Sequence, residues 1–229
     1  MKKNPKFRHE LKYEINYGQY LALQKRIQPI MSLDQYAQDS GCYQIKSIYF
    51  DTPNDKALKE KLYGLQKHEK FRIRYYNDDL THISLEKKLK YNSLCTKLGT
   101  VLSEQECRNL LEGRTDWMLN HSQPLVKELY CRMKNQVLRP KVMVSYRREP
   151  YVYPAGNVRV TFDSQIRSSM LRQNFLDRAA DIDTADNTGH MLLEIKYDNY
   201  LPEIISDIVQ TEGIRQQAFS KYAAARKFG

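Results

Sequence analysis

The sequence predicts an α+β domain built on an eight-stranded antiparallel β-barrel, with a charged lumen and helices packed outside. Two observations support this fold class. Ionisable residues recur at alternate positions of five short segments, 8–12, 70–74, 86–90, 159–163 and 194–196, and the residues between them are mostly apolar. Because successive side chains of a strand point to opposite faces, each segment would place its charges on one face and its apolar residues on the other.

The number of charged strand faces favours a closed sheet over an open one. A half-buried antiparallel strand turns its polar face to water, so a single charged strand is ordinary surface. Five such strands, mainly cationic and each with an acid in it or close by, indicate a closed or strongly curved sheet whose lumen is charged. Eight strands form a barrel wide enough for side chains or one slim ligand. We therefore expect one domain over residues 1–229, with a lumen suited to a polyanion and a metal ion.

The first half of the chain alternates strand and helix signals, separated by turn residues. Asp51-Thr52-Pro53-Asn54 predicts a turn, and Asn77-Asp78-Asp79 predicts the turn of a hairpin. In chain order, we expect a strand at 6–15, a helix at 17–30, a strand at 43–51, a short helix ending at 62, a hairpin of strands 70–76 and 82–90, and a short strand that includes Lys97.

The second half begins with a helix signal and continues with long strands. Ser103 lies three residues before Glu106, a capping-box pattern that opens a helix to about Leu111. In chain order, we then expect a helix from 124 to about 138, strands at 141–153 and 157–166, a polar loop at 173–189, a strand at 191–197, and helices at 202–209 and 214–228. The last helix is expected to close one end of the lumen, with a small-residue packing face formed by Ala218, Tyr222, Ala224 and Ala225.

Charge and composition restrict the class of partner. The net charge of +10, from 37 basic and 27 acidic residues, points to nucleic acid, nucleotides, inorganic polyphosphate or an anionic membrane. No apolar run approaches the ~18 residues that span a bilayer, and no apolar stretch follows the basic start, so neither a membrane segment nor a secretory signal is expected. The four scattered cysteines fit reduced thiols and a cytoplasmic location, and their spacing does not suggest zinc.

Arg72 and Arg74 are the most informative pair of cations. Two guanidinium groups about 7 Å apart on one strand face can each bind phosphate oxygens through two hydrogen bonds. A solvated strand face is the alternative explanation for this pair alone. Glu86, Lys88 and Lys90 lie on the neighbouring strand of the predicted hairpin, where facing like charges are destabilising unless an anion lies between them. The two strands together therefore favour a phosphate site.

Glu194 is a carboxylate between Leu193 and Ile195 in an otherwise apolar strand. A buried carboxylate is costly unless it is paired or bound to a cation. Pairing with Lys196 or with an opposing arginine is one explanation, and ligation of Mg²⁺ or Mn²⁺ beside substrate phosphates is the other. Asp163 could serve either purpose. The five histidines do not cluster, and neither a Ser-His-Asp arrangement nor a phosphate-binding glycine loop is present.

Eight short motifs occur in an order that resembles the VTC domain of polyphosphate polymerases, a branch of the CYTH-like triphosphate tunnel metalloenzymes. Each motif is weak alone, but together they cover nearly the whole chain. They are Phe7-Arg8-His9-Glu10-Leu11-Lys12-Tyr13, Ser47-Ile48-Tyr49-Phe50-Asp51, Phe71-Arg72-Ile73-Arg74-Tyr75-Tyr76, Leu85-Glu86-Lys87-Lys88, Tyr146-Arg147-Arg148, Val158-Arg159-Val160-Thr161-Phe162-Asp163, Leu193-Glu194-Ile195-Lys196 and Phe219-Ser220-Lys221-Tyr222.

The resemblance implies an antiparallel tunnel in which the γ-phosphate of ATP is transferred to a growing polyphosphate chain with Mn²⁺ or Mg²⁺ as cofactor. ATP and inorganic polyphosphate would be the partners, with no nucleic acid and no membrane. It makes Glu194 the metal ligand and implies a stand-alone enzyme of bacterial type. The implied catalytic cations are Lys12, Arg72, Arg74, Lys88 and Arg148, and the implied phosphate-binding residues are Lys61, Lys90, Lys97, Arg159, Lys196, Ser220 and Lys221, among which Arg159 and Lys196 are supported only as lumen residues.

Two departures from the family pattern bear on activity. The triphosphatases of the wider superfamily open with Glu-x-Glu-x-Lys, whereas this chain has Arg8, Glu10 and Lys12, which argues against a two-metal hydrolase. Ala218 stands where the eukaryotic polymerases have a lysine, which weakens one end of the phosphate path.

Two other function classes remain open from the sequence. A triphosphatase or nucleotide cyclase would keep the tunnel fold and change the product. A nucleic-acid-binding module would explain the positive charge and the 17 tyrosines through phosphate contacts and stacking. Against that module, Glu10, Glu86, Asp163 and Glu194 interrupt the cationic strands, where a nucleic-acid groove would avoid acids.

Overall fold

The computed structural model describes residues 7–37, 40–92, 94–170, 175–177, 184–185, 191–210, 213–217 and 219–226. Its longer strands are β1 (Arg8–Ile15), β3 (Tyr43–Asp51), β4 (Lys67–Tyr76), β5 (Asp79–Tyr91), β6 (Leu94–Leu102), β7 (Arg139–Tyr153), β8 (Val158–Ser169) and β10 (Met191–Tyr197). The helices are α1 (Tyr17–Ile27), α2 (Lys56–Leu62), α3 (Glu104–Leu111), α4 (Pro124–Gln136), α5 (Glu203–Val209), α6 (Lys221–Ala225) and the short 3₁₀ turns η1 (Asp116–Asn120) and η2 (Ala155–Asn157).

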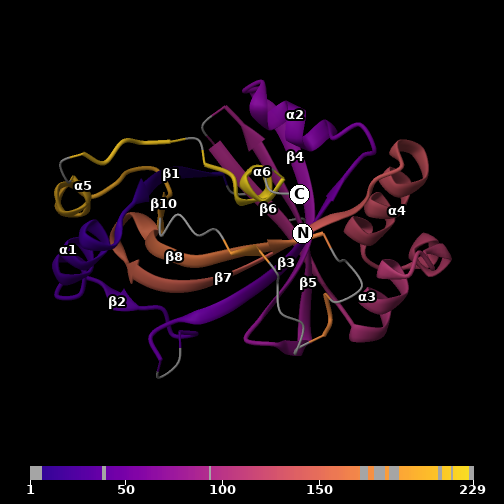
Figure 1. Ribbon diagram of the computed structural model, residues 1–229, viewed down its shortest axis with the longest axis horizontal. Helices are drawn as coiled ribbons and strands as arrows, with labels where there is room; N and C mark the ends of the chain where they lie inside the picture. The colour runs from indigo at the N-terminus through magenta and orange to yellow at the C-terminus, as the bar shows by residue number, and fades with distance from the viewer. Residues whose placement is uncertain are drawn as a thin grey trace.

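The eight longer strands close into an antiparallel barrel, as the sequence predicts. Their order is β7-β3-β4-β5-β6-β1-β10-β8, and a further pairing between β7 and β8 closes the circle. Two strands of two residues extend the sheet outside this circle, with β2 (Ser32–Leu33) paired to β7 and β9 (Thr184–Ala185) paired to β8. Figure 1 shows the long curved strands β7 and β8 side by side, with helices around the barrel.

The strand register places the charged faces toward the lumen. Lys12 lies opposite Glu194, and Arg72 lies opposite Glu86, so the ionisable faces of neighbouring strands are aligned. The alternating apolar residues point outward, and Ile73 and Ile195 are completely buried there. A one-residue slip in any pair would exchange these faces, so the alternating pattern itself fixes the register.

The hydrophobic core lies between the outer barrel wall and the helices. At one side, α3 and α4 cover β4 and β5 and bury Cys107, Val126 and Leu129 against the wall. At the other side, α1 and α5 cover β8 and β10 (Figure 1), with Leu23 and Ile205 in that cluster. The predicted capping box of Ser103 and Glu106 is present at α3. None of the described helices is long and apolar enough to cross a membrane.

Among the described residues, β1 and β6 share fewer residue pairs than any other neighbouring strands of the barrel. The two pairs are Arg8 with Cys95 and His9 with Leu94. Farther along β1, the C-terminal segment lies beside the strand, through a bridge between Tyr13 and Gln216 and a hydrogen bond of 2.9 Å from the Gln217 amide to the Lys12 carbonyl. The C-terminal segment therefore supplies part of the barrel wall.

The predicted helix at 214–228 is wrong for the described residues that precede Lys221. Residues 214–217 and 219–220 are not helical, and the helix α6 spans only Lys221–Ala225. Backbone pairing with β1 replaces the local helix preference there, because tertiary contacts override propensity in short segments. Ala218 and most of the predicted loop at 173–189 lie outside the described residues.

Candidate functional site

A large cavity lies inside the barrel and has a volume of about 550 Å³. Side chains from β1, β3, β4, β5, β7 and β10 form its walls, and α2 and the C-terminal segment add to them. Ten lysine and arginine residues line it, against two glutamates. The lining residues are Glu10, Lys12, Tyr49, Lys61, His68, Lys70, Arg72, Arg74, Lys88, Lys90, Tyr146, Arg148, Glu194, Lys196, Gln216, Gln217, Phe219, Ser220, Lys221 and Tyr222.

The structure brings together all but two of the residues that the sequence analysis selected for the site. The exceptions are Lys97 and Arg159, which do not line the cavity. The Lys97 amine lies 2.7 Å from Glu86 Oε1, and its side chain is about half exposed. Arg159 donates a hydrogen bond of 2.6 Å to the Tyr43 hydroxyl and pairs with Asp34 at 2.8 Å. The assignment of these two to phosphate binding remains a prediction.

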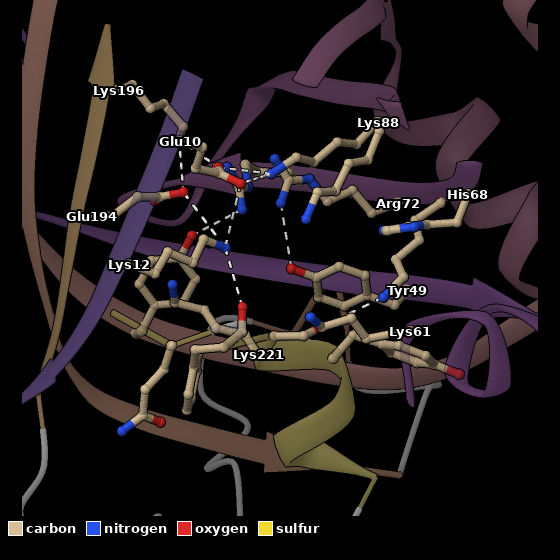
Figure 2. A pocket seen from close by; sticks show the side chains of 18 of the residues that line it. Glu10, Lys12, Tyr49, Lys61, His68, Arg72, Lys88, Glu194, Lys196 and Lys221 are labelled. Carbon is tan, nitrogen blue, oxygen red and sulfur yellow. Dashed lines mark hydrogen bonds and ion pairs between the residues drawn. The ribbon is translucent and has the colours of Figure 1, made fainter. Parts of the chain in front are cut away.

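Two adjacent carboxylates, Glu10 on β1 and Glu194 on β10, form the acidic part of the cavity. Figure 2 shows them on the same side of it, close to Lys196 and Lys12. The Lys196 amine lies 3.0 Å from Glu194 Oε1 and 3.6 Å from Glu10 Oε1, and Lys88 lies 2.7 Å from both oxygens of Glu10. Burial alone would raise the pKa of Glu194, but Lys196 and Lys12 hold it well below its usual range. Both carboxylates are therefore anionic and compensated by lysines.

Arg148 joins this acidic part to a second buried carboxylate, Asp163 on β8. The guanidinium donates to both oxygens of Asp163, at 2.6 and 2.8 Å, and to Glu194 Oε2 at 3.1 Å. Lys221 of α6 approaches Asp163 Oδ2 from another side at 2.5 Å, with its amine 4.5 Å from the centre of the Tyr146 ring. Asp163 therefore positions two cations at the cavity wall.

The two arginines of β4 are held in different ways. Arg72 pairs with Glu86 through Nε and Nη2, both at 2.6 Å, and donates to the Tyr49 hydroxyl at 3.3 Å. Arg74 has only neutral partners among its hydrogen bonds to described residues, the hydroxyls of Ser47 at 3.0 Å and Tyr146 at 2.9 Å. The charge of Arg74 is thus left for a ligand. Burial raises the pKa of Tyr49, but Arg72, Arg74 and Lys221 outweigh burial and lower it to about 8.

A group of basic residues at the opposite side of the cavity has no carboxylate partner among the described residues. It consists of Lys61 on α2, His68 and Lys70 on β4, and Lys90 on β5, and Figure 2 shows His68 and Lys61 away from the two glutamates. His68 lies opposite Lys90 in the strand register. Burial lowers the pKa of Lys70 to about 8, and the nearby Lys61 adds to this effect. Burial followed by the charge of Lys90 lowers the pKa of Lys61 as well.

Several lining residues were not selected from the sequence. Lys70 belongs to the alternating charged segment 70–74, although it was not assigned to the site. His68 lies on the same face, so extending the period-two pattern by two residues would have found it. Tyr49 lies in a strand that the sequence predicts, but nothing in its local sequence indicates that its hydroxyl faces the cavity. Four others depend on the path of the C-terminal segment and have no local sequence signal: Gln216, Gln217, Phe219 and Tyr222. Glu10 and Tyr146 also line the cavity, and both lie in segments that the sequence analysis quotes.

The described residues offer no group of three or more histidine, cysteine, aspartate or glutamate side chains able to hold a metal ion. Glu10 and Glu194 do provide carboxylate oxygens at one place, and hard divalent cations prefer such oxygens. Two carboxylates leave most of the coordination sphere to other ligands. A divalent ion here would need oxygen atoms from a bound phosphate compound to complete its coordination.

Comparisons with known proteins agree with this description. The chain matches the VTC domain family over residues 7–228. No curated protein matches the chain significantly.

Several solved structures are similar to this chain, and the similarity to the first of them indicates a shared fold. HpAC1 from Hippeastrum, a candidate adenylyl cyclase described as having a dominant triphosphatase activity, is 11% identical with a TM-score of 0.54, and the match covers 97% of this chain and 95% of that one. The PH1819 protein from Pyrococcus horikoshii OT3 is 12% identical with a TM-score of 0.49, over 97% of this chain and 99% of that one. A candidate adenylate cyclase from Bacillus halodurans is 13% identical with a TM-score of 0.49, over 84% and 81% of the two chains.

Proposed function

Because this chain belongs to the VTC domain family, we propose that it is a polyphosphate polymerase, which transfers the γ-phosphate of ATP to the end of an inorganic polyphosphate chain inside the barrel. The observation that supports this best is the cavity lining, in which ten lysine and arginine residues face two glutamates. A chain of phosphates carries its negative charge along its whole length, so it suits cations that surround a cavity on several strands.

Phosphoryl transfer requires the protein mainly to position the reactants and to neutralise their negative charge. Phosphoryl transfer needs reactants in line and neutralisation of oxygen charge, and it needs little covalent help. The attacking oxygen at the end of a polyphosphate chain is already ionised, so a strong general base is unnecessary. Preorganised cations stabilise the charge of the transition state. We assign this to the catalytic cations of the sequence analysis, Lys12, Arg72, Arg74, Lys88 and Arg148.

The other cations of the cavity bind the substrate chain in this proposal. Lys61 and Lys90 have no described carboxylate partner, and a phosphate compound would relieve their mutual repulsion. Ser220 and Lys221 bring the C-terminal segment to the same cavity. Lys196 is compensated by Glu194 and so contributes less net charge to the ligand.

Glu194 and its neighbour Glu10 would hold a divalent cation, Mn²⁺ or Mg²⁺, together with phosphate oxygens. Such an ion neutralises phosphate charge and orients the transferred group. The carboxylate type fits this use, and the lysines that compensate both glutamates in the free protein are flexible enough to turn to the phosphates instead.

The product formed from ATP tests the proposal directly. Incubated with ATP and Mn²⁺ or Mg²⁺, the protein should release ADP and form acid-labile polyphosphate, measured by ³¹P NMR and gel electrophoresis. Arg72→Gln should reduce this product strongly, because one of the cations next to the cavity is lost. If only orthophosphate appears, or pyrophosphate with a cyclic nucleotide, the proposal is wrong and a triphosphatase or cyclase takes its place.

A further inference from the structure

The helix α6 brings Lys221 to the cavity, yet this helix cannot hold its own position. It has only five residues, and isolated helices much shorter than about 12 residues are unstable in water. The segment before it is anchored to β1 through Gln216 and Gln217, several residues before Lys221. Other contacts must therefore fix the helix itself.

Two aspartates near the start of α2 supply such contacts. Asp51, at the end of β3, is completely buried and accepts a hydrogen bond from the Tyr222 hydroxyl. Asp55 accepts two hydrogen bonds of 2.9 Å from Arg226 Nη2, and Lys141 lies 3.4 Å away from it. We call these four residues, Asp51, Asp55, Tyr222 and Arg226, the latch.

The N-terminus of α2 lacks the usual capping hydrogen bond from its N-cap residue. Asp55 occupies the N-cap position with a left-handed backbone (φ 54°), but its side chain makes no capping hydrogen bond. Its carboxylate turns to Arg226 instead. Asp51 takes over the capping, accepting from the amides of Thr52, Ala57 and Leu58 at 2.7, 2.8 and 3.1 Å. One buried carboxylate thus joins the end of β3, the start of α2 and α6.

Tyr222 connects the latch to the cavity. Its hydroxyl reaches Asp51 behind the cavity wall, while its ring lines the cavity. There the ring lies 5.5 Å from that of Tyr49, and the Lys70 amine lies 5.1 Å from its centre. A shift of Tyr222 would therefore move the neighbouring Lys221 relative to both β4 and Asp163.

We propose that the latch is a set of positioning residues, which holds α6 so that Lys221 and Ser220 can bind the phosphate chain. This inference rests on the proposed function, because it takes Lys221 to be a phosphate ligand. It goes beyond that function because none of the four residues needs to touch the substrate through the group that forms the latch. Lys61 at the far end of α2 is linked to Lys221 by the same contacts.

Binding of tripolyphosphate, measured by titration calorimetry without turnover, tests the latch. Lys221→Met should weaken binding by about 10- to 100-fold, because a charge-assisted hydrogen bond is lost. Tyr222→Phe keeps the ring and removes only the hydroxyl, and Arg226→Gln removes the pair with Asp55. Each should weaken binding by about 3- to 10-fold. Combined with Lys221→Met, each should weaken it by clearly less than it does alone, because the charged residue that they position is already gone and only Ser220 remains.

Tyr20→Phe is the matched control. The Tyr20 hydroxyl also donates to a partly buried carboxylate, Glu149 Oε2, at 2.7 Å, but it lies on α1 and does not line the cavity. This variant should lower the melting temperature about as Tyr222→Phe does and leave tripolyphosphate binding unchanged. Arg226→Gln keeps the test valid if Tyr222→Phe does not fold, because it leaves the buried hydrogen bond between Tyr222 and Asp51 in place.

Three results would overturn the proposed latch. In the first, Tyr222→Phe and Arg226→Gln bind tripolyphosphate with wild-type affinity; in the second, their effects add in full to that of Lys221→Met. In the third, Lys221→Met itself binds with wild-type affinity. Failure of the proposed function looks different: the protein would bind tripolyphosphate with the expected pattern among the variants and form no polyphosphate from ATP.

Discussion

The affinity of the cavity for polyphosphate should fall steeply as the pH rises from 7 to 9. Three lining groups have a pKa of about 8 in the free protein, namely Lys70, Lys196 and Tyr49. For both lysines, burial is the main cause of the lowered pKa; for Tyr49, the arginines Arg72 and Arg74 lower it against the effect of burial. A bound polyanion favours the ammonium form of each lysine and the neutral form of the phenol. Binding therefore raises all three pKa values and takes up protons.

The magnitude follows from the position of these pKa values. A group with a pKa of about 8 is about 90% protonated at pH 7 and about 10% protonated at pH 9, so each group that must be protonated contributes up to about tenfold to the loss of affinity. At pH 8, each takes up about half a proton. Below pH 6.5 all three are already protonated, and their contribution disappears.

Calorimetry with long-chain polyphosphate, in buffers of different ionisation enthalpy, measures both the affinity and the proton uptake. Lys70→Met should bind more weakly at pH 7 and lose about tenfold less affinity up to pH 9 than the wild type does, with about half a proton less taken up at pH 8. Because the comparison is between proteins, the protons of the ligand cancel. Lys67→Met is the matched control, since Lys67 is an exposed lysine of the same strand that does not line the cavity. An unchanged pH dependence in Lys70→Met would refute the reasoning.

Two further predictions concern the buried carboxylates. Glu194→Gln should abolish the metal-dependent part of turnover and lower the free energy of unfolding by only about 1–3 kcal/mol. Breaking a buried ion pair outright costs ~3–5 kcal/mol, but here Lys196 keeps Glu10 and Arg148 keeps Asp163 as partners. If a thermal melt shows the larger loss of stability and the assay shows undiminished metal-dependent turnover, Glu194 has a structural role alone. Asp163→Asn should lower the free energy of unfolding in urea by about 3–5 kcal/mol, because two buried cations lose their partner. The control Glu104→Gln breaks an exposed pair with Arg108 and should lower it by less than about 1 kcal/mol. Equal effects of the two variants would contradict the inferred burial of the lumen charges.

The barrel could be predicted because five of its eight strands carry an alternating pattern of charged and apolar residues. Alternation of Arg72 and Arg74 with Phe71 and Ile73 defines both the strand and its lumen face, without knowledge of the partner strand. Closure then follows from how many such strands there are. The hairpin of β4 and β5 was predicted for the same reason, and Asn77 and Asp78 adopt the left-handed backbone that its turn requires.

The C-terminal segment could not be predicted in this way. Its alanines favour a helix locally, but the edge of β1 beyond its two pairs with β6 offers backbone partners that the sequence of the segment does not reveal. The same limit applies to Tyr222, because its hydroxyl donates a hydrogen bond to Asp51, which is 171 positions away in the sequence. For Arg159, the alternating pattern predicted the strand but not the partner Asp34, which lies just after β2.

The distribution of acids in the lumen explains how a cationic barrel can fold without its ligand. Glu86 compensates Arg72, Asp163 compensates Arg148 and Lys221, and Glu10 and Glu194 compensate three lysines, so most of the cations that a polyanion needs are already paired. The same pairing holds those side chains in place before the ligand arrives, which reduces the entropy lost on binding. Arg74 is an exception, because its described hydrogen-bond partners are neutral hydroxyls. The other exceptions, Lys61, Lys70 and Lys90, lie together, and burial lowers the charge that Lys61 and Lys70 carry at alkaline pH. An anionic chain should therefore gain most at that side of the cavity, while the paired side, with its two glutamates, is where a divalent ion could join the reacting phosphates.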